Sequence, residues 1–122
     1  MRFTQDSAPS INLVRSHGNG ELRIGNLSYR GAVIVSANTL VPLPELQRVE
    51  QLLSLDPADI LALEPEVVLL GTGAVQVFPA PEFQARFLSV GVGFEVMNTG
   101  AACRTYNVLI AEQRRAVAVL LA

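Results

Sequence analysis

The chain has 122 residues, enough for one hydrophobic core but too few for two domains of ordinary size. Half of the residues are hydrophobic and 16% are charged, against a usual charged share of roughly 25%. The net charge is -2, and the basic residues are arginines that lie singly, apart from the pair Arg114 and Arg115. A phosphate backbone requires a clustered basic field, so we expect no nucleic-acid partner and interpret the arginine pair as a solvated helix end.

The high apolar content has two explanations that the sequence leaves open. An apolar patch could remain exposed and mark a partner-binding face or an oligomer contact. A parallel sheet buried on both faces would give the same composition.

Cysteine content and the first residues point to a cellular location. A single cysteine, Cys103, excludes an intrachain disulfide and a cysteine-rich zinc site. Residues 1–10 lack the apolar core of a secretory signal, and no apolar run reaches the roughly 20 residues of a membrane span. We therefore expect a cytoplasmic protein with no transmembrane segment, no metal and no cofactor.

The first third of the chain is predicted to be rich in β-structure. Residues 1–10 are polar and predict a flexible lead-in, with a single α/β domain over residues 11–122. Residues 11–15 and 21–24 predict a β-hairpin, because the Asn-Gly pair between them favours positive φ. His17 falls in this turn and is expected to be exposed. Residues 32–36 predict a central strand, because their apolar run is continuous.

Prolines limit the regular elements in the middle of the chain. Pro42 and Pro44 interrupt any long element, so residues 38–53 are predicted to connect neighbouring elements, with a short helical or extended piece at the end. Asp56 fits an N-cap and Pro57 the first position of a helix through Leu63.

The C-terminal half predicts a βαβαβ unit. Residues 66–70, 94–97 and 116–121 form apolar runs typical of buried strands. Between them, residues 81–90 and 101–113 predict helices. Short connections imply parallel strands with right-handed crossovers.

Two loops are expected to meet at one edge of this sheet. Gly71-Thr72-Gly73 follows one strand and Asn98-Thr99-Gly100 the next, so their backbone N–H groups and threonine hydroxyls could hold an anion or polar group. The alternative is a tight turn whose glycines satisfy geometry alone. The loop is neither a P-loop nor a dinucleotide-binding motif, because the required lysine and glycine spacing are missing.

The following helix carries the remaining candidate residues. Cys103 lies in its first turn, where the helix dipole and Arg104 favour a thiolate, and the alternative is a buried, unreactive cysteine. Asn107 shares a face with Cys103. The hypothetical ligand pocket thus consists of Gly71, Thr72, Gly73, Thr99, Gly100, Cys103, Arg104 and Asn107.

Glu95 falls on a strand predicted to be mainly buried, so its carboxylate would need a partner. We predict a structural ion pair between Glu95 and Arg104, with Arg115 as the other available cation. The alternative is a general acid or base with a raised pKa. No catalytic residue is assigned.

The segments PEVVLLGTG and GFEVMNTGAACRTYNVLIAEQRRAVAVLL resemble the MTH-type family of domains of unknown function. That family includes archaeal and bacterial hypothetical proteins, an adipogenesis-associated human protein and a mitochondrial respiratory complex I assembly factor. The positions that match its motif are Gly71, Thr72, Gly73, Glu95, Met97, Thr99, Cys103, Arg104, Thr105, Tyr106, Asn107, Glu112 and Arg114. The chain departs from the pattern at Asn98, where the family often has an aspartate.

The resemblance implies a three-layer α/β domain with a mixed central sheet, a small extra β element and no established catalysis. It favours a non-enzymatic protein-interaction or assembly-accessory protein. The alternative is a small-molecule or anion-binding domain, with or without enzymatic activity, that uses the two loops with Cys103 and Arg104. The sequence does not indicate an oligomeric state.

Overall fold

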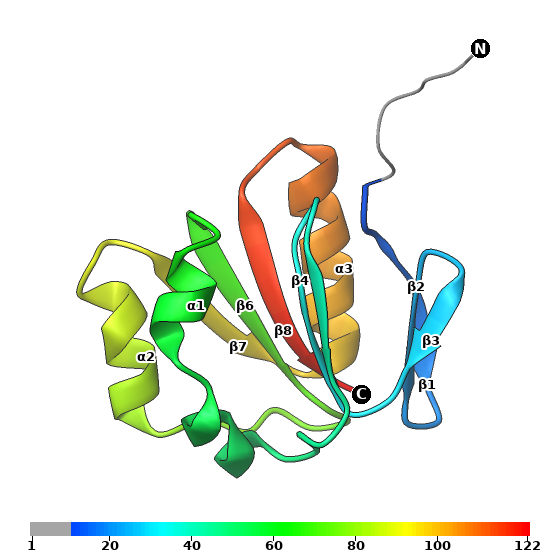
Figure 1. Cartoon of the computed structure of the whole chain (residues 1–122), viewed down its shortest axis with the longest axis horizontal. Coiled ribbons are helices and arrows are strands. Elements are labelled where there is room, and N and C mark those ends of the chain that lie inside the picture. Colours follow the sequence, from blue (N-terminus) through cyan, green and yellow to red (C-terminus); the bar gives the residue numbers. More distant parts are fainter. Residues whose placement is uncertain (1–10) are drawn as a thin grey trace.

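The computed structural model describes residues 11–122, and the predicted lead-in of residues 1–10 lies outside them. Within residues 11–122, eight strands and four helical segments form two sheets and their covering layers (Figure 1). The strands are β1 (Val14–Gly18), β2 (Glu21–Ile24), β3 (Leu27–Tyr29), β4 (Ala32–Val35), β5 (Leu40–Leu43), β6 (Val67–Thr72), β7 (Gly93–Met97) and β8 (Ala116–Leu121). The helices are η1 (Val49–Ser54), α1 (Pro57–Leu61), α2 (Pro81–Leu88) and α3 (Thr99–Ala111).

The larger sheet is mixed, with the strand order β5-β4-β8-β6-β7. The last strand of the chain, β8, lies between β4, which it pairs antiparallel, and β6, which it pairs parallel. All six residues of β8 are buried, as expected for a strand covered on both faces. The predicted βαβαβ unit is therefore confirmed as β6, α2, β7, α3 and β8.

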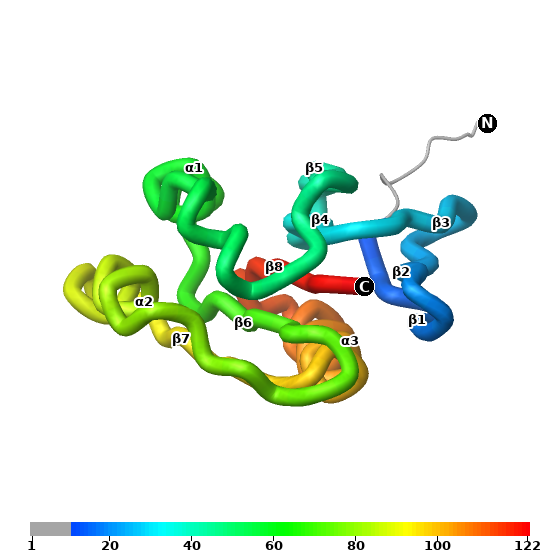
Figure 2. The backbone as a smooth tube through the Cα atoms, turned by 90° about the horizontal axis from the view of Figure 1, so that it is seen from below, coloured from blue at the N-terminus to red at the C-terminus, as the bar shows by residue number. Residues whose placement is uncertain are grey.

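Side chains alternate between the two faces of this sheet and build two cores. On one face, Phe83 and Phe87 of α2 pack with Phe94 of β7, and Leu52 and Ile60 belong to the same cluster. On the other face, the buried side of α3 packs on the sheet and on the small sheet β1-β2-β3. Figure 2 shows α3 and the helices α1 and α2 on opposite sides of the strands. This arrangement confirms the expected three-layer α/β fold with a mixed central sheet.

Two strands differ from the sequence prediction. The N-terminal hairpin gains a third strand, β3, which pairs antiparallel with β2. Residues 40–43, predicted as part of a connecting segment, form β5 at the edge of the large sheet. An edge strand has one unpaired side, so Pro42 can occupy it without breaking a central ladder.

The start of α1 follows the predicted capping chemistry, and α3 has a cap of the same kind. Asp56 Oδ1 accepts the Ala58 N–H at 2.9 Å, and Pro57 is the first residue of α1. At α3, Asn98 is the N-cap, and its Oδ1 accepts the Ala101 N–H at 2.8 Å. Asparagine supplies this acceptor as well as aspartate does, so the departure from the family pattern preserves the helix start.

Candidate functional site

The two predicted loops lie side by side at the carboxyl ends of β6 and β7. In the parallel register, Gly71 is opposite Met97. The Thr99 N–H donates to the Gly73 carbonyl at 2.8 Å, and the Gly73 N–H donates to Thr99 Oγ1 at 2.7 Å. The loop tips are therefore hydrogen-bonded to each other.

The glycines of the first loop have structural roles. A Cβ at Gly71 would lie 3.0 Å from Leu120 Cδ2 and 3.1 Å from the Thr99 Cα, so its absence allows α3 to approach β6 closely. Gly73 has a φ of 92°, a backbone conformation that residues with a side chain rarely adopt. The turn thus requires glycine at both positions.

Both threonine hydroxyls are used within the fold. Thr72 Oγ1 donates to the Val75 carbonyl at 2.6 Å and accepts the Val77 N–H at 3.0 Å. Thr99 Oγ1 donates to the Leu121 carbonyl in addition to accepting the Gly73 N–H. Both side chains are buried, so neither hydroxyl is oriented toward a ligand.

A recess of about 450 Å³ nevertheless adjoins the loops. It is bounded on one side by Gly73, Thr99 and Gly100 and on the other by the β1–β2 turn. Of the hypothetical pocket residues, Gly73, Thr99, Gly100 and Arg104 line it, whereas Gly71, Thr72, Cys103 and Asn107 do not.

His17 is one of the residues of this recess that sequence analysis did not assign to the site. A Cβ at Gly100 would lie 3.0 Å from His17 Cε1 and 3.1 Å from Nε2, so the imidazole lies directly against the first turn of α3. Arg104 and Asn98 line the same recess. His17 is exposed as expected, although it belongs to β1 and not to the turn where it was predicted. It faces Gly100, 83 positions away in the chain, a contact that no local pattern signals.

Cys103 points into the core between α3 and the sheet. It is 4% exposed, and burial raises the pKa of its thiol to about 11, despite the opposing effect of the Arg104 charge. At neutral pH the group is a thiol rather than a thiolate. This placement agrees with the buried-cysteine alternative.

Glu95 is exposed, contrary to the prediction of a buried carboxylate. The reason is that β7 is an edge strand, so part of its surface is uncovered. Among residues 11–122, the ion pairs join Arg30 to Glu21, Arg48 to Glu50 and Arg114 to Glu66. The expected Glu95–Arg104 pair is therefore not formed in the described part of the chain.

Within residues 11–122, the side chains of histidine, cysteine, aspartate and glutamate do not gather in threes as they would around a metal ion. The helices of the same region are all too short or too polar to cross a bilayer.

Solved structures share this architecture over nearly their whole length. A crystal structure of a Bordetella parapertussis protein superposes with a TM-score of 0.80 at 38% identity and covers 94% of this chain and 98% of that one. The solution structure of a Bordetella pertussis protein, described as an Mth938-like domain, gives a TM-score of 0.75 at 29% identity and covers 99% and 92%. The fold is thus that of an Mth938-like α/β domain.

The family model described as protein of unknown function (DUF498/DUF598) matches residues 14–121. The chain belongs to this family, which confirms the resemblance to MTH-type domains. A relative in Francisella tularensis subsp. holarctica, the "13 kDa major membrane protein", is 36% identical over 62 residues. That match spans 51% of this chain and 50% of the relative.

Proposed function

We propose that the chain is a non-enzymatic protein-interaction domain whose loop 74–80 binds an apolar segment of a partner protein. The carrying observation is the exposure of apolar side chains within this one loop. Phe78 is 67% exposed and Val75 66%, and Val77 is exposed between them. Large apolar side chains that gather on a surface are typical of interaction sites.

Hydrogen bonds hold the main chain of this loop from residue 75 to residue 77. The Thr72 hydroxyl is bonded to Val75 and Val77, and Gln76 Nε2 donates to the Val96 carbonyl of β7 at 2.8 Å. Because the main chain is already ordered, little free energy would be spent on ordering the loop when a partner binds.

The chemistry of the sheet edge supports a non-enzymatic role. Cys103 is buried with a raised pKa, and the hydroxyls of Thr72 and Thr99 are engaged in internal hydrogen bonds. The thiol and the two hydroxyls are therefore poorly placed to act as nucleophiles. An assembly-accessory role and a cytoplasmic location belong to the same proposal; the first is an analogy with the mitochondrial assembly-factor branch of the MTH-type family.

The test compares three baits in affinity capture: the natural chain, a Val75→Ser/Phe78→Ser variant and a Leu88→Ser control. Leu88 is an exposed apolar residue of α2 outside the loop. Both soluble and detergent-solubilised membrane fractions are used, since the Francisella relative is named a membrane protein. We expect a partner that the natural chain and the control retain and the loop variant loses.

A synthetic apolar peptide from that partner should then shift the amide resonances of residues 74–78 in the purified chain. Capture that is equal for all three baits, or a peptide that shifts other residues, would contradict the proposal.

The recess beside α3 supports a second candidate function, binding of a small anion. Its specific support is that His17 and Arg104 both line the recess, where His17 lies against Gly100 in the N-terminal turn of α3. Inorganic phosphate should shift the amides of Gly73 and Gly100, and Arg104→Ala should remove the shift while Arg86→Ala, on α2, should not. Unchanged spectra would exclude this candidate.

A further inference from the structure

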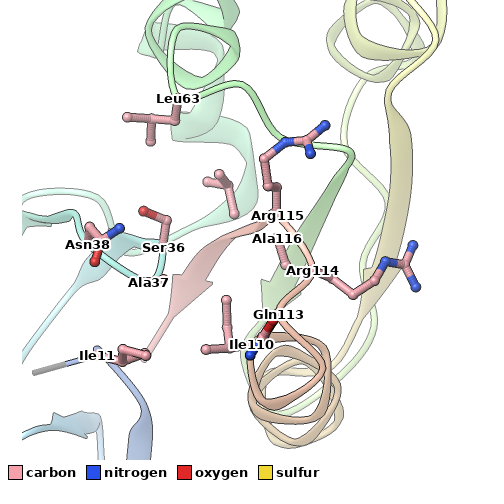
Figure 3. A pocket seen from close by; sticks show the side chains of 11 residues that line it. Ile11, Ser36, Ala37, Asn38, Leu63, Ile110, Gln113, Arg114, Arg115 and Ala116 are labelled. Atoms are coloured by element: carbon pink, nitrogen blue, oxygen red, sulfur yellow. The ribbon is translucent and has the colours of Figure 1, made fainter. Parts of the chain in front are cut away.

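A second cavity, of about 350 Å³, lies at the other end of the large sheet's strands from the two loops (Figure 3). It is bounded by the turn that follows β4, the end of α3 and the start of β8. Its volume lies within the range of roughly 300–1,000 Å³ that is usual for small-molecule sites. Neither the recess beside His17 nor loop 74–80 contributes to it.

The walls of this cavity are apolar and come from separate segments. Ile11, Leu63 and Ile110 approach it from three sides in Figure 3, and Val117 of β8 contributes to the lining. Such walls provide favourable burial for an aliphatic chain.

The wall that follows β4 is braced against α3 through Asn12. The Asn12 side chain donates to the Ser36 and Thr39 carbonyls at 3.0 and 3.1 Å, and its N–H donates to the Ala37 carbonyl at 3.0 Å. The Tyr106 hydroxyl donates to the Asn12 carbonyl at 2.8 Å. The cavity is therefore held open by hydrogen bonds rather than by a loose loop.

Uncharged polar side chains occupy the rim. Ser36, Asn38 and Gln113 line the cavity, and the hydrogen bonds found within residues 11–122 do not use their side chains. Their hydroxyl and amide groups are both donors and acceptors, so they match an amide or alcohol.

The guanidinium groups of the two neighbouring arginines already have hydrogen-bonding partners outside the cavity. Arg114 Nε lies 3.2 Å from Glu66 Oε1, and Arg115 Nε donates to the Glu64 carbonyl at 2.9 Å. Both guanidinium groups point away from the cavity in Figure 3. A carboxylate in the cavity would thus have no guanidinium group directed toward it, and the lining offers no carboxylate to an ammonium group.

From this combination we propose that the cavity binds a short aliphatic chain that ends in an uncharged amide or hydroxyl group. The aliphatic part lies between Ile11, Leu63 and Ile110, and the polar end meets Asn38 and Gln113.

The test uses three probes with the same chain: hexanamide, hexanoate and hexylamine. We expect hexanamide to produce saturable shifts of the methyl resonances of Ile11, Leu63 and Ile110. Hexanoate and hexylamine should each bind at least roughly tenfold more weakly than hexanamide, because burial of an unpaired charge is costly. Absence of saturable shifts, or equal affinity for the three probes, would overturn the proposal.

Two variants locate the site. Leu63→Trp should fill the cavity and abolish the shifts, with Val108→Trp on the exposed face of α3 as its control. Asn38→Ala/Gln113→Gly should weaken hexanamide binding by roughly tenfold, through loss of two hydrogen-bonding partners. Gln113 has a φ of 62°, so glycine suits the backbone at this position. The Asn38→Ala/Gln113→Gly variant therefore tests the site even if Leu63→Trp fails to fold. Unchanged affinity in the Asn38→Ala/Gln113→Gly variant would refute the assignment of the rim.

Discussion

The side-chain amide of Asn107 exchanges two hydrogen bonds with the main chain of Val14. The Val14 N–H donates to Asn107 Oδ1 at 3.0 Å, and Asn107 Nδ2 donates to the Val14 carbonyl at 2.8 Å. One side chain of α3 thus pairs with the first residue of β1 as a neighbouring strand would. This contact, and not a ligand, explains the polar residue on the buried side of the helix.

Replacing Asn107 with alanine should destabilise the protein by about 2 kcal/mol, because the buried Val14 loses both partners of its main chain. Urea denaturation measures this change in unfolding free energy. Amide exchange should also accelerate more in β2 than in β8, since β2 depends on this connection to α3.

Asn38→Ala provides the control for the Asn107 variant, because Asn38 is exposed and its change should stay within about 0.5 kcal/mol. An equally small effect of Asn107→Ala would show that packing alone holds the small sheet on α3.

The Thr99 hydroxyl is expected to support the junction of the two loops with β8. Thr99→Val keeps the shape but removes both hydrogen bonds of the hydroxyl, leaving the Gly73 N–H and Leu121 carbonyl without this partner. We expect a loss of about 2 kcal/mol in thermal or urea unfolding. Thr99→Ser retains the hydroxyl and should lose less; equal losses in the two variants would mean that the hydroxyl contributes no more to stability than the methyl group does.

Cys103 should react slowly with iodoacetamide near neutral pH. Burial raises the pKa of the thiol to about 11 from the ordinary 9.0, so the folded protein holds a neutral, inaccessible thiol. The same shift contributes stability below the unfolded pKa that is lost as pH rises through the folded one. Mass spectrometry should show faster labelling in urea; equal rates in both states would indicate a reactive thiol.

Glu66 should contribute to stability in mild acid. The hydrogen bond from the Arg115 N–H at 2.9 Å, followed by the interaction with the Arg114 side chain, lowers the pKa of its carboxyl group below 4.5. This contribution is present above the unfolded pKa and is lost as pH falls through the lowered folded value. Urea midpoints should therefore fall less steeply for Glu66→Gln than for the natural chain as the pH is lowered from above the unfolded pKa of the carboxyl group to below its folded pKa.

Glu95→Gln serves as the control for Glu66→Gln, because Glu95 is exposed and outside the ion pairs found among residues 11–122. Identical acid profiles for the two variants would mean that Glu66 makes no specific contribution.

The central part of the fold was predictable because its strands carry a direct physical signal. β6 and β8 are covered on both faces and show continuous apolar runs, and the helices between the parallel strands have recognisable starts. The strands β3 and β5 were missed. Pro42 argues against a strand in general, and only the position of β5 at the sheet edge, which the sequence does not reveal, makes it acceptable.

The meeting of the two loops was also predictable, since it follows from parallel register. The part played by His17 was not, because its approach to Gly100 depends on how the small sheet packs on α3. Glu95 was misjudged because the sequence does not indicate that β7 is an edge strand. Local patterns thus identified the loops, while the opposite wall of the recess required the tertiary structure.

The central position of β8 has a consequence for synthesis on the ribosome. Every other strand of the large sheet leaves the ribosome before residues 116–121 do, yet β4 and β6 reach one another only through β8. Until these residues emerge, the pairs β4–β5 and β6–β7 cannot be joined into one sheet, so each pair that forms has an unpaired apolar edge. A pause before β8 would leave these edges open to association with other nascent chains.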